Sequence, residues 1–132
     1  MIHVHNEWDN LREVVVGQAG PQDHSDPTVI EEINQDLNDL CSILRDRGVT
    51  VHRVVGNNVS TLRIRDRLFV AGNTLIDPAM KDSSRVRELE TLVPLLGEAQ
   101  LVVMPQGKEL TMDATNVSRL GSTWLYLESS SG

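Results

Sequence analysis

A long amphipathic helix pattern, set between two short valine-rich runs, constrains the fold of this chain more than any other feature of its sequence. Asp26 offers a side-chain acceptor and Pro27 suits a first helical position, so the pattern predicts a helix over 27–47 that stops at Gly48. Its apolar residues recur at spacings of three, four and seven and share one face; they are Val29, Ile30, Ile33, Leu37, Leu40, Cys41 and Leu44. The flanking runs NLREVVVGQAG and VTVHRVV have the composition of strands.

The same order of elements recurs further along the chain. RDRLFVAGNTLIDPAM predicts a hairpin about Gly72-Asn73, SSRVRELETLVPLLG predicts a helix over 83–96, and AQLVVMP predicts the strand after it. ATNVSRLG and STWLYLES predict a third hairpin. The opening MIHVHNEW alternates and could pair with the NLREVVVGQAG strand through a turn near Asp9-Asn10, and we expect Trp8 to pack beneath that turn.

These elements predict a single α/β domain, which suits a length of 132 residues. It would contain about two and a half strand-strand-helix-strand units, at approximately 1–56, 57–106 and, for the truncated third, 107–132. A repeated unit of this kind cannot bury its apolar face alone. Strand edges left open by an incomplete series predict self-association, most simply as a homo-oligomer of two chains.

Composition excludes several classes of function. The net charge of −7 opposes binding to nucleic acid or to an anionic membrane surface, and an aromatic content of 3% offers no base-stacking platform. The sequence shows neither a signal peptide nor an apolar run long enough to span a membrane, so we expect a cytoplasmic protein. With one cysteine, Cys41, the chain forms no intrachain disulfide.

Four segments resemble, in the same order, parts of the glycine and inosamine-phosphate amidinotransferases. They are HNEWDNLREVVVGQA, DLNDLCSILRDRGVTVHRV, RIRDRLFVAGNTLIDPAM with SSRVRELE, and MDATNVSRLGSTWLYLESS. The resemblance runs along nearly the whole chain but covers only the first part of that family's fold. It implies a partial pentein-like domain, that is, a portion of an α/β-propeller whose pseudo-symmetric units surround a guanidine site.

The resemblance also implies roles for particular residues. Asp66 matches the carboxylate that holds the guanidinium group of arginine, and Asp113 matches the acid that partners the catalytic histidine. Other matched positions, which we expect near the substrate or in its support, are Met80, Arg85, Glu88, Asn116, Arg119 and Gly121. Asn116 stands where the family has a second carboxylate. The family's histidine and cysteine fall beyond the matched segments, and the stretch before the third hairpin is compressed to PQGKEL.

Amidino transfer needs carboxylates that grip the planar guanidinium, a thiolate nucleophile and an imidazole that moves protons. This chain offers the carboxylates, whereas Cys41 falls on the apolar helix face and is predicted to be a buried packing residue. Structural alternatives remain for both acids. Asp66 could form ion pairs at a strand start, and Asp113 could be a turn residue that accepts backbone N–H bonds. Arg119 could pair with either acid.

Two functions from different classes stay open. The chain could be a guanidine-binding part of an amidinotransferase-like enzyme, with the histidine and cysteine supplied by a complementary chain. Alternatively it is a non-catalytic, homo-oligomeric module for binding or assembly. The expected small-molecule partner is arginine or another guanidine or amine, without a cofactor. His3 and His5 lie two apart but no third ligand is evident, so we expect no metal site.

Overall fold

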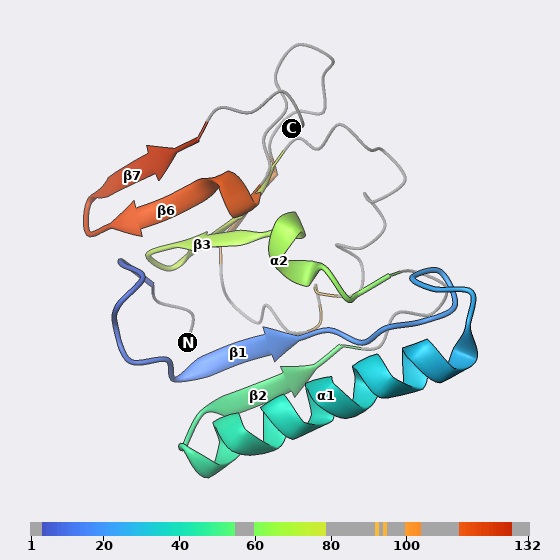
Figure 1. Cartoon of the computed structure of the whole chain (residues 1–132). Helices are drawn as coiled ribbons and strands as arrows, with labels where there is room; N and C mark the ends of the chain where they lie inside the picture. The colour runs from blue at the N-terminus through green and yellow to red at the C-terminus, as the bar shows by residue number, and fades with distance from the viewer. Residues whose placement is uncertain are drawn as a thin grey trace, which may run out of the picture.

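The computed structural model of the chain describes residues 4–54, 60–78, 92, 94, 100–103 and 114–127. Figure 1 shows the elements in chain order: β1 Glu13–Val16, α1 Pro27–Asp46, β2 Thr50–Arg53, α2 Ile64–Arg67, β3 Phe69–Ala71, β4 Thr74–Asp77, β5 Gln100–Val103, the 3-10 turn η2 Ala114–Asn116, β6 Val117–Leu120 and β7 Thr123–Tyr126. Within these residues the strands form three sheets, ordered β1-β2, β3-β4-β5 and β6-β7. The fold is mixed α/β, as the sequence predicts.

The first unit contains the last three elements of the predicted strand-strand-helix-strand order. α1 begins at Pro27, where the Asp26 side chain accepts a hydrogen bond of 2.9 Å from the N–H of Thr28. The helix ends at Asp46, and Gly48 follows with φ +80°, a left-handed conformation that glycine adopts without steric cost. β1 and β2 pair in parallel on either side of this helical crossover.

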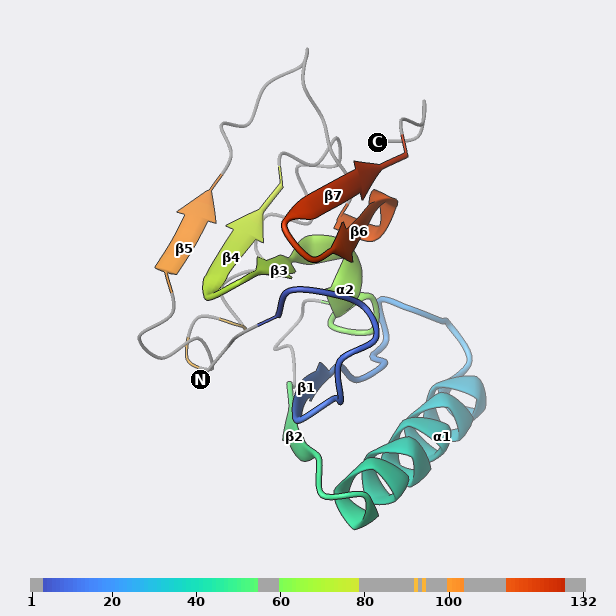
Figure 2. The same cartoon turned by 90° about the vertical axis from the view of Figure 1, so that its left-hand side faces the viewer.

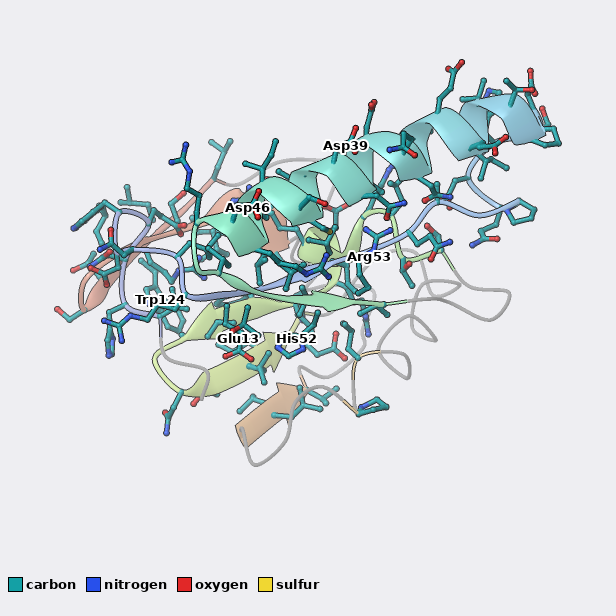
Figure 3. All side chains as sticks on the ribbon, turned by 90° about the horizontal axis from the view of Figure 1, so that it is seen from below. Glu13, Asp39, Asp46, His52, Arg53 and Trp124 are labelled. Atoms are coloured by element: carbon teal, nitrogen blue, oxygen red, sulfur yellow. The ribbon has the colours of Figure 1, made fainter. Side chains whose placement is uncertain are left out.

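α1 lies over one face of the β1–β2 sheet (Figure 3). Cys41 is 1% exposed there, so the prediction that it is buried is confirmed. Leu40, which the pattern assigns to the covered face, is 45% exposed, and the neighbouring Ile43 is 58% exposed. The apolar stripe of α1 is therefore wider than the two strands beneath it can cover. No helix within the described residues is long and apolar enough to cross a membrane.

The end of β1 is tied to the chain that leads into α2. A Cβ atom on Gly17 would lie 1.6 Å from the carbonyl oxygen of Thr61, so only glycine allows these two backbones to approach. Thr61 is 2% exposed, and its hydroxyl accepts from the N–H of Gln18 at 2.9 Å and donates to the carbonyl of Val54 at 3.0 Å. This junction ties the segment that leads into α2 to the end of β1.

The second sheet contains the predicted hairpin. β3 and β4 pair antiparallel about a turn in which Gly72 has φ +60°, and β5 joins β4 in parallel. β5 falls in the predicted AQLVVMP strand. Of the helix predicted over 83–96, Leu92 and Pro94 are described and both are helical; the rest lies outside the described residues.

The predicted pairing of the opening segment with the first strand is wrong. Val4 instead bridges Gly72, with N–H···O distances of 2.9 and 2.7 Å, and Asn6 bridges Leu120. The segment thus joins the second and third sheets, because alternation indicates a strand-like segment but not its partner. The Trp8 side chain is 66% exposed, so it is not packed beneath the turn either.

The third hairpin, β6 and β7, forms as predicted and turns at Gly121 with φ +62°. It lies beside the β3–β4 hairpin and at the opposite end of the molecule from α1 in both views (Figures 1 and 2). A core cluster joins the two hairpins through η2; its members are Phe69, Ala114 and Val117, with Ala71 and Ile76 packed against them. The Phe69 ring also meets that of Trp124 edge-on, with centroids 5.6 Å apart.

Candidate functional site

Asp66, the carboxylate predicted to hold a guanidinium group, lies in the short helix α2. Its N–H donates to the Arg63 carbonyl at 3.1 Å, its side chain is half-buried, and α2 has no side-chain N-cap. The expected strand start at Asp66 is wrong, since β3 begins only at Phe69. The alternative that Asp66 forms an ion pair stays a prediction.

The residue after Asp66 forms a buried ion pair that the sequence analysis missed. Arg67 is 0% exposed and Asp77, at the end of β4, is 1% exposed. The Nη2 atom of Arg67 lies 2.7 Å from Oδ1 of Asp77 and donates to Oδ2 at 2.9 Å. The pair therefore ties the end of α2 directly to β4 across the β3–β4 hairpin.

The environment of this pair is electrostatically unfavourable. Burial raises the pKa of the Asp77 carboxyl above its ordinary value, and the Arg67 charge opposes that rise. Among the described residues, the buried Nε and Nη1 atoms of Arg67 have no hydrogen-bond partner. A guanidinium group with five N–H donors is thus satisfied at one nitrogen only. The pair is held by the fold in a position that costs desolvation.

Arg119, a second predicted site residue, does not pair with Asp66, and its other expected partner, Asp113, lies outside the described residues. Its Nη2 atom lies 3.0 Å from Oε1 of Glu7, and its Nη1 donates to the Val70 carbonyl at 2.7 Å. The expectation that Arg119 could pair with Asp66 is therefore wrong. The reason is topological, since the opening segment runs beside β6 and brings Glu7 to Arg119 first.

Asn116 closes η2, the turn that leads into β6, and its carbonyl accepts from the N–H of Leu127 at 2.9 Å. η2 packs against α2, so the structure brings the segments that carry Asn116 and Asp66 together. Asp113 immediately precedes η2 in the sequence. Asp113, Met80, Arg85 and Glu88 themselves lie outside the described residues, as does His3, so their roles stay predictions.

The described thiol, Cys41, and the imidazole of His52 lie in the first unit rather than beside Asp66. The Cys41 sulfur lies beneath α1, 3.7 Å from Nη1 of Arg53. His52 and Glu13 lie on the face of the β1–β2 sheet that α1 leaves uncovered, with Nε2 and Oε1 2.7 Å apart (Figure 3). The hydrogen bond to His52 holds the pKa of Glu13 below its ordinary value. Within the described residues no three His, Cys, Asp or Glu side chains gather as a metal site would require.

Comparison with known proteins links this arrangement to one enzyme class. The whole chain aligns with two Streptomyces griseus proteins, at 30% identity with inosamine-phosphate amidinotransferase 2 and at 28% with inosamine-phosphate amidinotransferase 1, and covers 56% of each. This chain is related to the amidinotransferases. It spans about half the length of these curated relatives. No protein-family model matches the sequence.

Two solved amidinotransferase structures show the same fold. The enzyme of the saxitoxin biosynthetic pathway from Microseira wollei matches 93% of this chain and 53% of its own, with a TM-score of 0.77 and 23% identity. Inosamine-phosphate amidinotransferase StrB1 from Streptomyces griseus matches 96% of this chain and 55% of its own, with a TM-score of 0.75 and 24% identity.

The sequence alignments with the two curated relatives run over 199 and 196 residues, so the matched regions of those relatives are longer than this chain of 132 residues.

The sequence carries only a weak signal for the missed ion pair. Arg67 and Asp77 have opposite charges and lie five residues before and five after Gly72. In the β3–β4 register Phe69 lies opposite Ile76, so a continued ladder would place Arg67 opposite Pro78 and Asp77 opposite Leu68, with the two charged side chains on opposite faces. Arg67 instead belongs to α2, so the pairing and its burial depend on how that helical turn packs against β4.

Proposed function

We propose that this chain forms the guanidine-binding part of an amidinotransferase-type site, with arginine as the ligand. One observation carries the proposal: α2, which bears Asp66, packs against η2, which begins one residue after Asp113. Two segments of the sequence that supply the proposed carboxylates thus meet in space although the two acids lie 47 positions apart. The relationship to the amidinotransferases over about half their length supports the same assignment.

Guanidinium chemistry suits these side chains. A carboxylate accepts two parallel, charge-assisted hydrogen bonds from the planar fork, and we assign this contact to Asp66. Asp113 would orient an imidazole that moves protons, while Asn116, Arg119, Met80 and Arg85 would support the ligand's surroundings.

Transfer of the amidino group also needs a thiolate that attacks the central guanidine carbon. Cys41 does not suit this role, because it is 1% exposed beneath α1. We therefore assign the nucleophile and the imidazole to protein outside these 132 residues, with the reaction taking place in the cytoplasm. The three units, at approximately 1–56, 57–106 and 107–132, would then be one portion of a pentein-like α/β-propeller.

Calorimetric titration of L-arginine into the full chain tests the proposal. We expect weak binding by the wild type, with a Kd of about 1 mM, because part of the ligand's surroundings is supplied elsewhere. Asp66→Asn should abolish the heat, since the amide keeps the shape of the carboxylate but loses its charge. Asp39→Asn is the matched control, because Asp39 is an exposed acid on the outer side of α1 (Figure 3). Equal binding by the Asp66→Asn variant and wild type would contradict the assignment.

A homo-oligomeric assembly is the second candidate, and strand β7 favours it. All four of its residues are exposed, including Trp124 at 49% and Leu125 at 54%, and Leu127 beyond it is 70% exposed. β7 carries no charged residue in a chain of net charge −7. We propose that two copies pair along this strand, where no charged side chain of β7 opposes the contact.

Sedimentation equilibrium separates the dimer from the monomer of 14.7 kDa. We expect twice that mass for the wild type and the monomer mass for Leu125→Lys, because a buried lysine on each copy would oppose the pairing. Ile43→Lys, at a similarly exposed apolar residue on α1, should leave the dimer intact. A wild-type chain that sediments as a monomer at high concentration would remove the assembly proposal.

A further inference from the structure

We propose that Arg67 and Asp77 are positioning residues, whose buried ion pair sets the direction of Asp66 and thereby its ability to receive a guanidinium group. The inference rests on the proposed function for its ligand. It rests on the structure for its geometry: Arg67 follows Asp66 directly in α2 and is bound to the far strand of the next hairpin. Neither residue was indicated by the sequence analysis.

Stability alone is a poor reason for this pair. Two charged side chains at 0% and 1% exposure have lost their hydration, and Nε and Nη1 of Arg67 have no hydrogen-bond partner among the described residues. Apolar residues of similar volume commonly replace such buried pairs without loss of stability. An incompletely satisfied charge pair in a core therefore needs another explanation, and fixing one geometry is the role that its contacts suit.

α2 needs such an anchor. It has four residues and no side-chain N-cap, so it has little stability of its own. The N–H of Asp66 makes a backbone hydrogen bond of 3.1 Å within this single turn. The hydrogen bond from Nη2 of Arg67 to Oδ2 of Asp77, with Oδ1 of the same carboxylate 2.7 Å from Nη2, fastens the turn's last residue to β4. Because a guanidinium–carboxylate contact is directional, it restricts rotation of the turn as well as its distance from the sheet.

The anchor also links the two halves of the proposed site. Phe69, two residues after Arg67, packs with Ala114 of η2 in the core cluster. α2 is therefore held on one side by Asp77 and on the other by its packing against η2. Release of the ion pair would leave the η2 contact in place but free the turn to rotate, which moves Asp66 relative to Asn116. This predicts a loss of ligand affinity that exceeds any loss of stability.

The test replaces the pair with apolar residues, Arg67→Met together with Asp77→Leu, in the full chain. The control makes the same substitutions at an exposed pair of the same charges on α1, Arg45→Met with Asp46→Leu. Urea unfolding midpoints are measured first, so that only variants as stable as wild type are compared. Two readouts are then compared with wild type: the exchange rate of the Asp66 amide proton, and the Kd for L-arginine by calorimetry. We expect the core variant to exchange at least about tenfold faster at Asp66 and to bind arginine at least about tenfold more weakly. The control should change neither.

Each outcome is decisive. An unchanged Asp66 exchange rate, or faster exchange with an unchanged Kd, overturns the positioning role. A wild-type chain that does not bind arginine overturns the proposed function, and the exchange readout then still decides whether the pair holds α2. If the double variant does not fold, Arg67→Lys replaces it, since lysine keeps the charge but lacks the planar fork. Unchanged exchange in that variant overturns the inference.

Discussion

Removing one member of the Arg67–Asp77 pair should cost far more stability than removing both. Arg67→Met leaves the Asp77 carboxylate at 1% exposure without its cation, and Asp77→Leu leaves a guanidinium group at 0% exposure without its anion. A buried charge that loses its partner typically costs about 3–5 kcal/mol. The double variant removes both charges and the orphaned Nε and Nη1 atoms, so we expect it within about 1.5 kcal/mol of wild type.

The two single variants should also differ from each other. A buried carboxyl can escape its penalty by binding a proton, whereas an arginine side chain stays charged. We therefore expect Asp77→Leu to be the more destabilising change, in a variant whose own stability lacks the pH dependence that the Asp77 carboxyl contributes. Arg67→Met should become less costly as the pH falls toward the ordinary range of a carboxyl pKa.

The direction of this change in stability with pH follows from the raised pKa of Asp77. A folded state that holds the proton more tightly than the unfolded state is most stable below the unfolded pKa of about 3.9, and it loses stability as the pH rises through the folded-state pKa. Without Arg67, which opposes the rise, that loss is larger. Urea unfolding followed by circular dichroism at pH 4.5 and pH 7.5 measures it. Single variants that each cost less than about 1 kcal/mol, or a double variant that costs as much as the two together, would refute this account.

Three further predictions concern other parts of the fold. Gly17→Ala places a Cβ atom 1.6 Å from a backbone carbonyl oxygen and should lower the free energy of unfolding in urea by about 3 kcal/mol or more. Gly48→Ala should cost about 1–2 kcal/mol, because there the left-handed φ is the sole obstacle. Equal costs for the two variants would contradict the close approach at Gly17. Asp26→Ala should cost about 1 kcal/mol through loss of the helix cap, and an unchanged unfolding midpoint would show that the cap contributes nothing. NMR titration should find the pKa of Glu13 below its ordinary value, and should find the ordinary value restored in His52→Ala. The stability that this contact contributes is present above the unfolded-state pKa of a glutamate. It is lost as the pH falls through the lowered folded-state pKa.

Much of the fold was predictable because the signals that define it are local. The cap at Asp26 and the left-handed Gly48 lie within a few residues of the ends of α1, so the sequence alone gives both bounds closely. The turns at Gly72 and Gly121 likewise specify their hairpins without reference to the rest of the chain. Burial of Cys41 follows from the helical period. The same period misassigned Leu40, because the width of the sheet beneath a helix is not a local property.

The candidate site was predictable only in part. A resemblance in sequence indicated Asp66 and Asn116, and the structure places the segments that carry them in contact; Asp113, Met80 and Arg85 remain predictions outside the described residues. The partner of Arg119 lies 112 positions away at Glu7, and no spacing rule reaches that far.

The sequence by itself thus determined the kinds of elements and their order, because helix caps, glycine turns and hydrophobic periods act over a few residues. Tertiary structure alone decided which charges meet and which are buried. In the sequence, Arg67 and Asp77 are ordinary charged residues beside a hairpin, and only the packed structure removes both from water. The opening segment has the alternation of a strand, yet its partner was chosen by which sheet edge lay within reach of Val4 and Asn6. Desolvation and edge pairing depend on the whole assembly of sheets, and a single stretch of sequence carries no record of that assembly.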